Sequence, residues 1–354
     1  MSGVFPRMEL REHAEKIVKD DWESFVLGVD IGGTHTNLGV AGVKGERTFL
    51  LFSTHFESQK LDSLIPAVKN TLEYARENYG IELEKGCAGA AGPVKGCAKA
   101  KLTNVSWSVD SEEIKRECGL EEFYLVNDFQ LIGYGIESLR DEDLYLVKKG
   151  DPGLGENRAI IGAGTGLGKS MLVYYEAKYW PISCEGGHAD FPVQNQLDLD
   201  LAEHIRGGRK TPTSYEDVLS GRGIVRIYNF LKEKYGVGER NEVIEKAEDR
   251  AASISMNKDE DRIARKTFEL YAKYYGRCAK NYVLDTLATG GLYIAGGIAP
   301  KNLEIFVSEN FQNEFLKAEK QRQILERTPI YAIVNYDVSL YGACNAALVQ
   351  ACFV

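Results

Sequence analysis

The sequence has no apolar run long enough to cross a bilayer, and residues 1–24 lack the apolar core of a secretory signal peptide. Positive charge is not in excess either. Lys and Arg total 43 against 52 Asp and Glu, a formal net charge of −9, which disfavours nucleic acid or an anionic membrane as the main partner. Seven cysteines without a C-x-x-C pair disfavour a disulfide framework or a structural zinc site. We therefore expect a cytoplasmic protein with reduced thiols, which binds neither nucleic acid nor membrane.

The chain length is sufficient for two domains, since 354 residues exceed the usual size of one. Near the N-terminus, apolar residues recur at helical spacing: Leu10, Ala14, Ile17, Val18 and Trp22. This periodicity predicts one amphipathic helix over residues 1–23. We expect the helix to pack on its own domain, and a partner-binding arm is the alternative.

From residue 25 the pattern alternates between strands and helices. In each half, three β-rich segments separated by short turns come first, at 25–31, 36–43 and 47–56, and then at 158–163, 168–175 and 179–183. Each set of three is expected to form an antiparallel meander. Helical and strand segments follow in both halves, without a long linker or a low-complexity segment between them. This order predicts an α/β protein made of two similar lobes that close on a cleft.

The segment IIGAGTGLGKSMLVYY, residues 160–175, raises a question about phosphate binding. Its GLGKS part resembles the end of a P-loop, but Ala163 stands where that motif needs its first glycine. The G-x-G-x-x-G dinucleotide pattern fails as well, because Leu167 occupies the third glycine position. The β-branched and aromatic run that follows favours a strand over a helix. The segment is therefore predicted to be a glycine-rich turn between two strands.

Glycine turns of this kind end predicted strands in both halves of the chain. Their residues are Asp30 with Gly32, Gly33 and Thr34, then Gly164, Thr165 and Gly166, and finally Gly296 and Gly297. Glycine allows positive φ and close approach of backbone amides to an anion. A plain hairpin turn explains any one of them. Their recurrence in both halves fits a triphosphate gripped from two lobes better.

Several polar side chains adjoin these turns. Asp128 follows Asn127 where a predicted strand meets a helix, so it is either a helix N-cap or a carboxylate facing a ligand crevice. Glu185 and His188 flank two glycines and together can accept and donate several hydrogen bonds to a polyol. Zinc binding by Cys184 and His188 is weakly indicated, since no further cysteine ligand is near. Glu216 is either a first-turn residue stabilised by the helix dipole or a ligand-binding residue.

The three glycine turns resemble the phosphate 1, phosphate 2 and adenosine motifs of the superfamily of sugar kinases, heat-shock ATPases and actin. More specifically, six ordered segments resemble bacterial-type glucokinase, and the resemblance extends from about residue 25 to residue 350. These segments are LTNVSW (102–107), LVNDF (125–129), GAGTGLG (162–168), CEGGHADF (184–191), SYEDVLSG (214–221) and YIAGGI (293–298).

The resemblance implies two ribonuclease H-like, actin-like ATPase lobes with a central cleft, each a mixed sheet flanked by helices. It implies an N-terminal extension over 1–23, a small domain formed by 24–137 and 332–354, and a large domain over 138–331. A homodimer is expected.

The resemblance also implies ATP-dependent phosphorylation of the 6-hydroxyl of glucose, with Asp128 as the general base and Mg²⁺ as cofactor. The sugar would be bound by Asn104, Asn127, Asp128, Glu185, His188 and Glu216. ATP would be bound by Asp30, Gly32, Gly33, Thr34, Gly164, Thr165, Gly166, Gly296 and Gly297. Asp30 would position the metal mainly through water.

Three departures from the family pattern stand out: His35 replaces a usual asparagine, Asn37 differs, and Cys184 replaces a common glycine. The first two adjoin the first glycine turn, so the sequence does not predict the nucleotide affinity.

The alternative enzyme is another hexose or amino-sugar kinase on the same scaffold. A sugar-responsive regulator is disfavoured, because about 23 residues before the first strand cannot hold a DNA-binding domain. The related ROK group usually has a cysteine-rich zinc motif after E-x-G-H, and HADFPVQNQLDLD contains no cysteine.

Overall fold

The computed structural model describes residues 7–92, 94–102 and 105–349. The chain divides into two compact units, and each is described by itself below. Unit 1 comprises residues 1–140 and 335–354, and unit 2 comprises residues 141–334.

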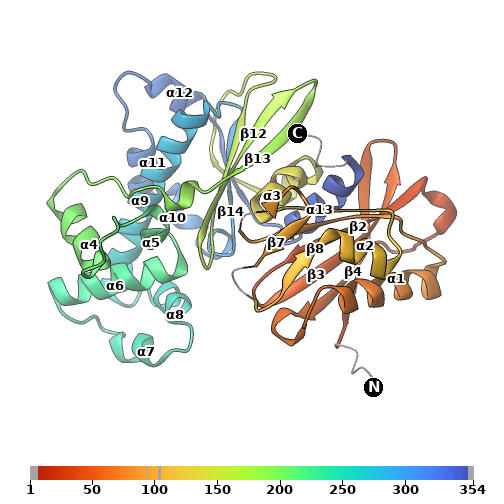
Figure 1. Ribbon diagram of the computed structural model, residues 1–354. Coiled ribbons are helices and arrows are strands. Elements are labelled where there is room, and N and C mark those ends of the chain that lie inside the picture. The colour runs from red at the N-terminus through yellow and green to blue at the C-terminus, as the bar shows by residue number, and fades with distance from the viewer. Residues whose placement is uncertain (1–6, 93, 103–104, 350–354) are drawn as a thin grey trace. The chain divides into compact units, whose positions relative to one another are not determined.

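Unit 1 is built on a six-stranded mixed sheet in the order β1-β4-β3-β2-β5-β9 (Figure 1). Its strands are β1 Glu9–Glu12, β2 Ser24–Ile31, β3 His35–Lys44, β4 Arg47–Glu57, β5 Lys85–Ala90 and β9 Glu122–Asn127. Strands β2, β3 and β4 form the expected antiparallel meander, while β5 and β9 run parallel to β2. The carboxyl ends of β2, β5 and β9 therefore share one edge of the sheet.

Helices and a small second sheet complete unit 1. The helices are α1 Ile65–Tyr79, α2 Ser111–Cys118, α3 Asp128–Gly135 and α13 Val338–Val349, with 3₁₀ turns η1 Lys19–Asp21, η2 Ser58–Lys60 and η3 Ile136–Ser138. The small sheet contains β6 Val94–Lys95, β7 Lys99–Lys101 and β8 Ser108–Asp110. Helix α13 lies between the sheet and α3, which accounts for its mostly apolar sequence. It packs closely on α3, since a Cβ at Gly342 would come within 1.7 Å of the Leu131 carbonyl oxygen.

The helix expected over residues 1–23 is wrong for the described part of that segment. Strand β1 pairs antiparallel with β4, with Leu10 opposite Thr54, and only the short turn η1 is helical. The free edge of β4 offers backbone partners that outweigh a weak helical pattern. The apolar residue Trp22 instead packs its ring over Gly42, where a Cβ would lie 2.2 Å away.

Unit 2 contains the second six-stranded sheet, in the order β10-β15-β14-β11-β12-β13. Its strands are β10 Leu144–Lys148, β11 Arg158–Ala163, β12 Leu167–Tyr175, β13 Lys178–Cys184, β14 Gly291–Ala295 and β15 Ile330–Ile333. Strands β11, β12 and β13 form the second expected antiparallel meander, and β14 runs parallel to β11. Two mixed sheets flanked by helices confirm the predicted fold class. The cleft stays a prediction.

The helices of unit 2 follow the meander in sequence. They are α4 Gln196–Arg206, α5 Tyr215–Val218, α6 Gly221–Tyr235, α7 Asn241–Lys246, α8 Arg250–Met256, α9 Arg262–Thr286, α10 Leu303–Val307, α11 Glu309–Phe315 and α12 Arg322–Arg327, with 3₁₀ turns η4 Asp141–Asp143, η5 Gly186–His188 and η6 Ala299–Lys301.

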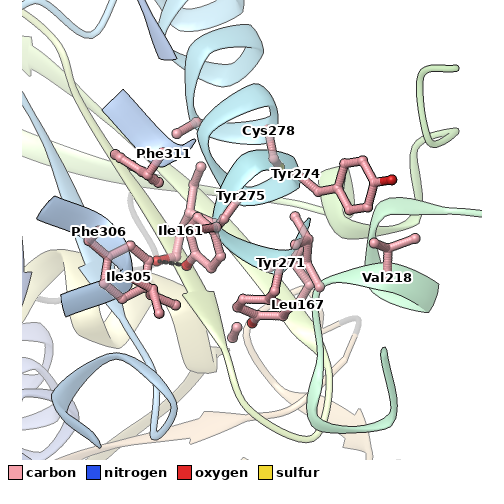
Figure 2. Packing of buried hydrophobic residues seen from close by; sticks show 14 of the residues in the cluster. Ile161, Leu167, Val218, Tyr271, Tyr274, Tyr275, Cys278, Ile305, Phe306 and Phe311 are labelled. Atoms are coloured by element: carbon pink, nitrogen blue, oxygen red, sulfur yellow. Dashed lines mark hydrogen bonds between the residues drawn. The ribbon is translucent and has the colours of Figure 1, made fainter. Parts of the chain in front are cut away.

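The long helix α9 supplies the centre of the unit 2 core, as Figure 2 shows. Its Tyr275 hydroxyl donates a hydrogen bond to the Ile161 carbonyl of β11, at 3.3 Å. Further along α9, the fully buried Arg277 lies 2.8 Å from the Asp198 carboxylate of α4 and 2.9 Å from the Glu314 carboxylate of α11. These ion pairs link α9 to α4 and α11, and the loss of either carboxylate would leave a buried charge uncompensated.

Two sequence expectations concern cysteines and membranes. The thiols of Cys87, Cys118, Cys184, Cys278 and Cys344 are free, whereas Cys97 is disulfide-bonded, so the expectation that all thiols are reduced is wrong at Cys97. Over the described ranges, no helix has both the length and the apolar character needed to span a bilayer.

Candidate active site

The first glycine turn, between β2 and β3, is held from behind by η2. The carbonyl oxygens of Gly32 and Thr34 accept hydrogen bonds from the Ser58 hydroxyl (2.6 Å) and the Ser58 amide (2.9 Å). The Gly33 carbonyl accepts from the Gln59 side chain at 2.9 Å. The amides of Gly33 and Thr34 donate to no acceptor in the described part of the chain. These amides are therefore available to an anion.

Asp30 lies beside this turn, at the end of β2. Burial raises the pKa of its carboxyl group to about 6, and no hydrogen bond or ion pair of this carboxylate occurs within the described residues. A cation nearby would oppose this effect, because it favours the charged carboxylate. Asn37 lies directly opposite Asp30 on β3, and its side-chain oxygen is 2.7 Å from His55 Nδ1.

Asn127 and Asp128 stand where β9 passes into α3. The Asn127 side-chain oxygen accepts from the Phe129 amide at 2.9 Å. The Asn127 side chain also accepts from the Gln130 amide, and the Gln130 side chain accepts from the Asn127 amide at 3.2 Å. This reciprocal pair is a capping box, so Asn127 is the N-cap and the N-cap alternative for Asp128 is wrong. Asp128 instead occupies the first turn of α3, where its Oδ1 accepts from the Phe129 amide at 3.0 Å.

Within unit 1, strand register brings these carboxylates to one edge. Asp30 pairs with Gly89 across β2 and β5, and Ala90 pairs with Asn127 across β5 and β9. Because adjacent strands are about 4.8 Å apart, the ends of β2 and β9 are roughly 10 Å apart. Asn104, the other sugar-binding residue expected in this half, lies outside the described residues.

The second glycine turn is the hairpin between β11 and β12, and a strand follows it as predicted. The Gly164 amide donates to the Gly166 carbonyl at 2.9 Å, and the Gly221 amide at the start of α6 donates to the Gly164 carbonyl at 2.8 Å. In the described residues the amides of Thr165 and Gly166 have no acceptor. Positive φ is not needed at Gly164 or Gly166. Close approach matters instead, since a Cβ at Gly166 would lie 2.6 Å from a Glu216 carboxylate oxygen.

The third glycine turn adjoins the hairpin because β14 pairs with β11. Gly296 has a φ of +84°, and a Cβ there would lie 2.4 Å from the Ala163 carbonyl oxygen. Both features require glycine. Gly297 faces open space. The structure thus brings Gly164–Gly166 and Gly296–Gly297 together at one edge of the unit 2 sheet.

Glu185 and His188 belong to a loop that leaves β13 (residues 185–188). We call it the sugar loop after the role that the sequence resemblance predicts for it. The His188 amide donates to the Glu185 carbonyl at 3.0 Å, and His188 Nε2 lies 3.8 Å from Glu185 Oε2. Both side chains are 62% exposed, so their polar atoms can reach a ligand. The loop rests on the hairpin, because a Cβ at Gly187 would lie 1.9 Å from the Leu167 carbonyl oxygen.

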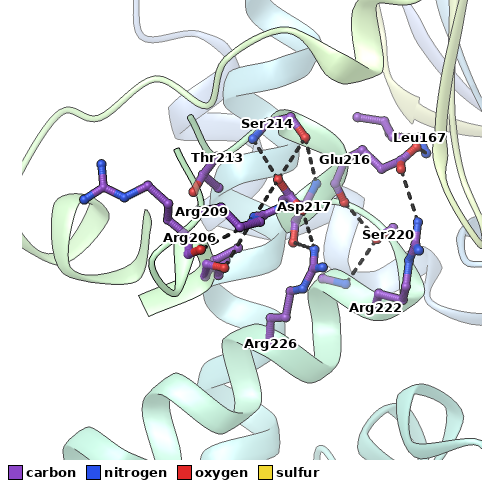
Figure 3. Close-up of polar contacts among 12 residues, drawn as sticks. Leu167, Arg206, Arg209, Thr213, Ser214, Glu216, Asp217, Ser220, Arg222 and Arg226 are labelled. Atoms are coloured by element: carbon purple, nitrogen blue, oxygen red, sulfur yellow. Dashed lines mark hydrogen bonds and ion pairs between the residues drawn. The ribbon is translucent and has the colours of Figure 1, made fainter. Parts of the chain in front are cut away.

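Glu216 is brought beside the sugar loop by backbone pairing, with the Tyr215 amide donating to the Ala189 carbonyl at 2.9 Å. Its Oε2 accepts from the Leu167 amide at 3.0 Å, and its Oε1 lies 3.2 Å from Arg222 Nη2 (Figure 3). Glu216 is therefore more than a first-turn residue of α5. Sequence reasoning missed the contacts with Leu167 and Arg222, since no local pattern signals them.

Lys169, the lysine of the P-loop-like string, is buried in β12. Its ammonium lies 4.7 Å from the centre of the Tyr215 ring and 5.0 Å from that of Tyr282. Its Cδ would be 3.0 Å from a Cβ at Gly186, so the side chain runs beneath the sugar loop. Lys169 consequently supports that loop and does not stand in a phosphate-binding turn.

Comparisons with known proteins agree with this geometry. The glucokinase family model matches residues 27–350. A glucokinase of Nostoc punctiforme is 36% identical over 341 residues, covering 92% of this chain and 99% of the relative. A crystal structure of glucokinase from an Antarctic psychrotroph superposes with a TM-score of 0.79 and 26% identity, over 92% of this chain and 98% of that one.

A more distant structure shares the fold. It is a ROK family glucokinase from Streptomyces griseus, solved in complex with glucose and AMPPNP, with a TM-score of 0.61 and 19% identity over 92% of this chain and 99% of that one. The two mixed sheets flanked by helices, together with the family match and the superposed glucokinase, place the chain among the sugar kinases of the actin-like ATPase fold. Within that class, the chain belongs to the glucokinase family.

Proposed function

We propose that Asp128 is the general base with which this sugar kinase transfers the γ-phosphoryl group of ATP to the 6-hydroxyl of glucose. Membership of the glucokinase family gives the reaction, whose products are glucose 6-phosphate and ADP. The capping box at Asn127 supports the role of Asp128, because Asn127 already caps the helix. A carboxylate at the carboxyl edge of an α/β sheet is well placed for a ligand.

Asp128 would accept the hydroxyl proton as the new O–P bond forms. A sugar hydroxyl is a weak nucleophile, and a carboxylate within hydrogen-bond reach takes its proton as phosphoryl transfer proceeds. After transfer, the proton stays on the Asp128 carboxyl group until solvent removes it.

The sugar hydroxyls would be oriented by Asn104, Asn127, Asp128, Glu185, His188 and Glu216. The exposed carboxylate of Glu185 and imidazole of His188 support this role, since together they offer acceptors and one donor. Fixing the sugar in one orientation reduces the entropy that transfer must overcome.

The phosphates of ATP would be bound by the amides of Gly33, Thr34, Thr165 and Gly166, which lack acceptors within the described ranges. Gly32, Gly164, Gly296 and Gly297 would keep the backbone close to the nucleotide. Asp30 fits a Mg²⁺ site. Burial favours the protonated form of its carboxyl group, and a bound cation would counteract this by stabilising the charged carboxylate. When bound, Mg²⁺ would neutralise phosphate charge.

One assay tests the proposal. Initial rates with ATP would be measured for glucose, mannose, galactose, fructose and N-acetylglucosamine, in parallel for the wild type and Asp128→Asn. We expect the highest kcat/KM with glucose and a large loss of kcat in the variant. A higher kcat/KM with another sugar would move the assignment to another hexose or amino-sugar kinase.

The assembly and location of the protein are further parts of the proposal. We infer a homodimer, tested by light scattering across a concentration series. We also infer a cytoplasmic location, tested by fractionation of cells that express the full chain.

A further inference from the structure

Glu216 stands between the two substrate sites proposed for unit 2. Its side chain is 21% exposed, and both carboxylate oxygens have partners inside the unit. Oε2 accepts from the Leu167 amide at 3.0 Å, and Oε1 lies 3.2 Å from Arg222 Nη2. A carboxylate accepts about four hydrogen bonds, so room for sugar hydroxyls remains.

The Leu167 backbone belongs to both substrate sites at once. Its amide is the first after the Gly164–Gly166 hairpin, and its carbonyl oxygen faces Gly187 of the sugar loop at a distance that admits no side chain. The other end of the hairpin is fixed by the Gly221 amide, which donates to the Gly164 carbonyl at 2.8 Å. The hairpin is therefore held on both sides by the α5–α6 corner. Figure 3 shows the contact on the Leu167 side.

Arg222 is the second residue of α6 and is 63% exposed. A cation in the first turn of a helix is disfavoured by the helix dipole, so its position does not serve the helix. Its guanidinium holds the Glu216 carboxylate on the side opposite Leu167. Ser220 fixes the same corner, since its hydroxyl donates to the Glu216 carbonyl at 2.8 Å and accepts from the Gly223 amide at 3.1 Å.

We propose that Arg222 is a positioning residue, which orients Glu216 so that its carboxylate links the bound sugar to the phosphate-binding hairpin. Sugar hydroxyls that bond to Glu216 hold the carboxylate against the Leu167 amide, and the hairpin is then ordered before ATP arrives. Glucose thereby strengthens ATP binding, since part of the ordering cost is already met. This inference rests on the proposed function.

The test measures dissociation constants of a nonhydrolysable ATP analogue with and without saturating glucose, together with KM and kcat. The ratio of the two dissociation constants is the coupling factor. We expect Arg222→Gln to lower the coupling factor and to raise KM for ATP about three- to fivefold, the size expected for a partly exposed ion pair. Arg222→Lys keeps the charge and should restore part of the coupling.

The matched control is Arg226→Gln on the same helix. Arg226 pairs with Asp217 at 2.6 Å. Within the described residues the polar partners of Asp217 are Ser214, Arg209 and Arg226, and none of them belongs to the hairpin. This variant should leave the coupling factor unchanged even if the melting temperature falls. A purely structural role of Arg222 would instead change the melting temperature and leave the coupling intact.

A double-mutant cycle decides the mechanism. If Arg222 acts through Glu216, the Glu216→Gln/Arg222→Gln double variant loses no more coupling than Glu216→Gln alone. Two outcomes would overturn the inference but leave the proposed function intact, provided that the wild type phosphorylates glucose. One is an additive loss of coupling in the double variant, and the other is an unchanged coupling factor in Arg222→Gln. A wild type that phosphorylates no hexose would overturn the proposed function and the inference with it.

Discussion

Gly187 of the sugar loop lies directly against the carbonyl oxygen of Leu167, and a Cβ atom at Gly187 would come within 1.9 Å of that oxygen. Leu167 is the first residue of β12, and its side chain is buried in the unit 2 core. The backbone of β12 is therefore unable to shift away from Gly187, and any side chain at this position must displace the sugar loop.

Gly187→Ala should weaken glucose binding. Moving the loop displaces Glu185 and His188, and an overpacked contact costs about 1–3 kcal/mol, so KM for glucose should rise about tenfold or more. Gly186→Ala is the matched control, because its Cβ would meet the flexible Lys169 side chain at 3.0 Å rather than backbone. Steady-state kinetics on both variants checks this, and equal KM values for the two would contradict it.

The Lys169→Met substitution tests whether Lys169 binds phosphate, as a P-loop lysine does, or supports the sugar loop from within the protein. A P-loop lysine contacts phosphates, so its loss would chiefly raise KM for ATP. Because Lys169 lies between the Tyr215 and Tyr282 rings beneath the sugar loop, we expect KM for glucose to change more than KM for ATP. Kinetics with each substrate varied in turn measures both values, and a dominant effect on ATP would restore the P-loop interpretation.

The sequence was sufficient to predict both meanders and the turns between their strands, because alternating apolar runs and glycine clusters are local signals. The N-terminal helix was wrong since residues 9–12 obtain backbone partners from β4, which lies some forty residues further along the chain. The contacts of Glu216 with Leu167 and Arg222 depend on how α5, α6 and the hairpin pack. No local spacing encodes such an arrangement.

Gly166→Ala should impair ATP binding through the Glu216 carboxylate. A Cβ at Gly166 would lie 2.6 Å from Glu216 Oε2, whereas one at Gly164 would meet nothing within 4 Å. We expect KM for ATP to rise about fivefold or more in Gly166→Ala, as for an overpacked contact of at least 1 kcal/mol. Because the Cβ of Gly164→Ala meets no protein atom, KM for ATP should rise less in this variant than in Gly166→Ala. Similar KM values for the two variants would count against the phosphate role of the hairpin.

Asp128→Asn should lower kcat at least about 10²-fold, the loss expected when a general base is removed. Helix α3 should persist, because its capping box belongs to Asn127 and Gln130. Asp110→Asn is a matched control, since Asp110 caps α2 in the same unit. It should leave kcat unchanged. Circular dichroism and glucose binding would establish folding, and near-normal turnover in Asp128→Asn would remove Asp128 from the mechanism.

The pKa of Asp30 predicts a pH-dependent stability. Burial raises the pKa of this carboxyl group from 3.8 to about 6. A raised acid pKa stabilises the folded protein below pH 3.8, and this contribution disappears as the pH rises through 6. Asp30→Asn does not titrate, so the difference in unfolding free energy between wild type and variant isolates the effect.

The stability of the wild type relative to Asp30→Asn should therefore fall between pH 5 and pH 7.5, by about 1.4 kcal/mol for the single group. Urea unfolding of both proteins at the two pH values measures it. Mg²⁺ with ATP at pH 7.5 should stabilise the wild type more than Asp30→Asn, because a bound cation favours the charged carboxylate. A difference that stays constant with pH would show that Asp30 is not destabilised by burial, and equal stabilisation of both proteins by Mg²⁺ with ATP would argue against a metal-positioning role.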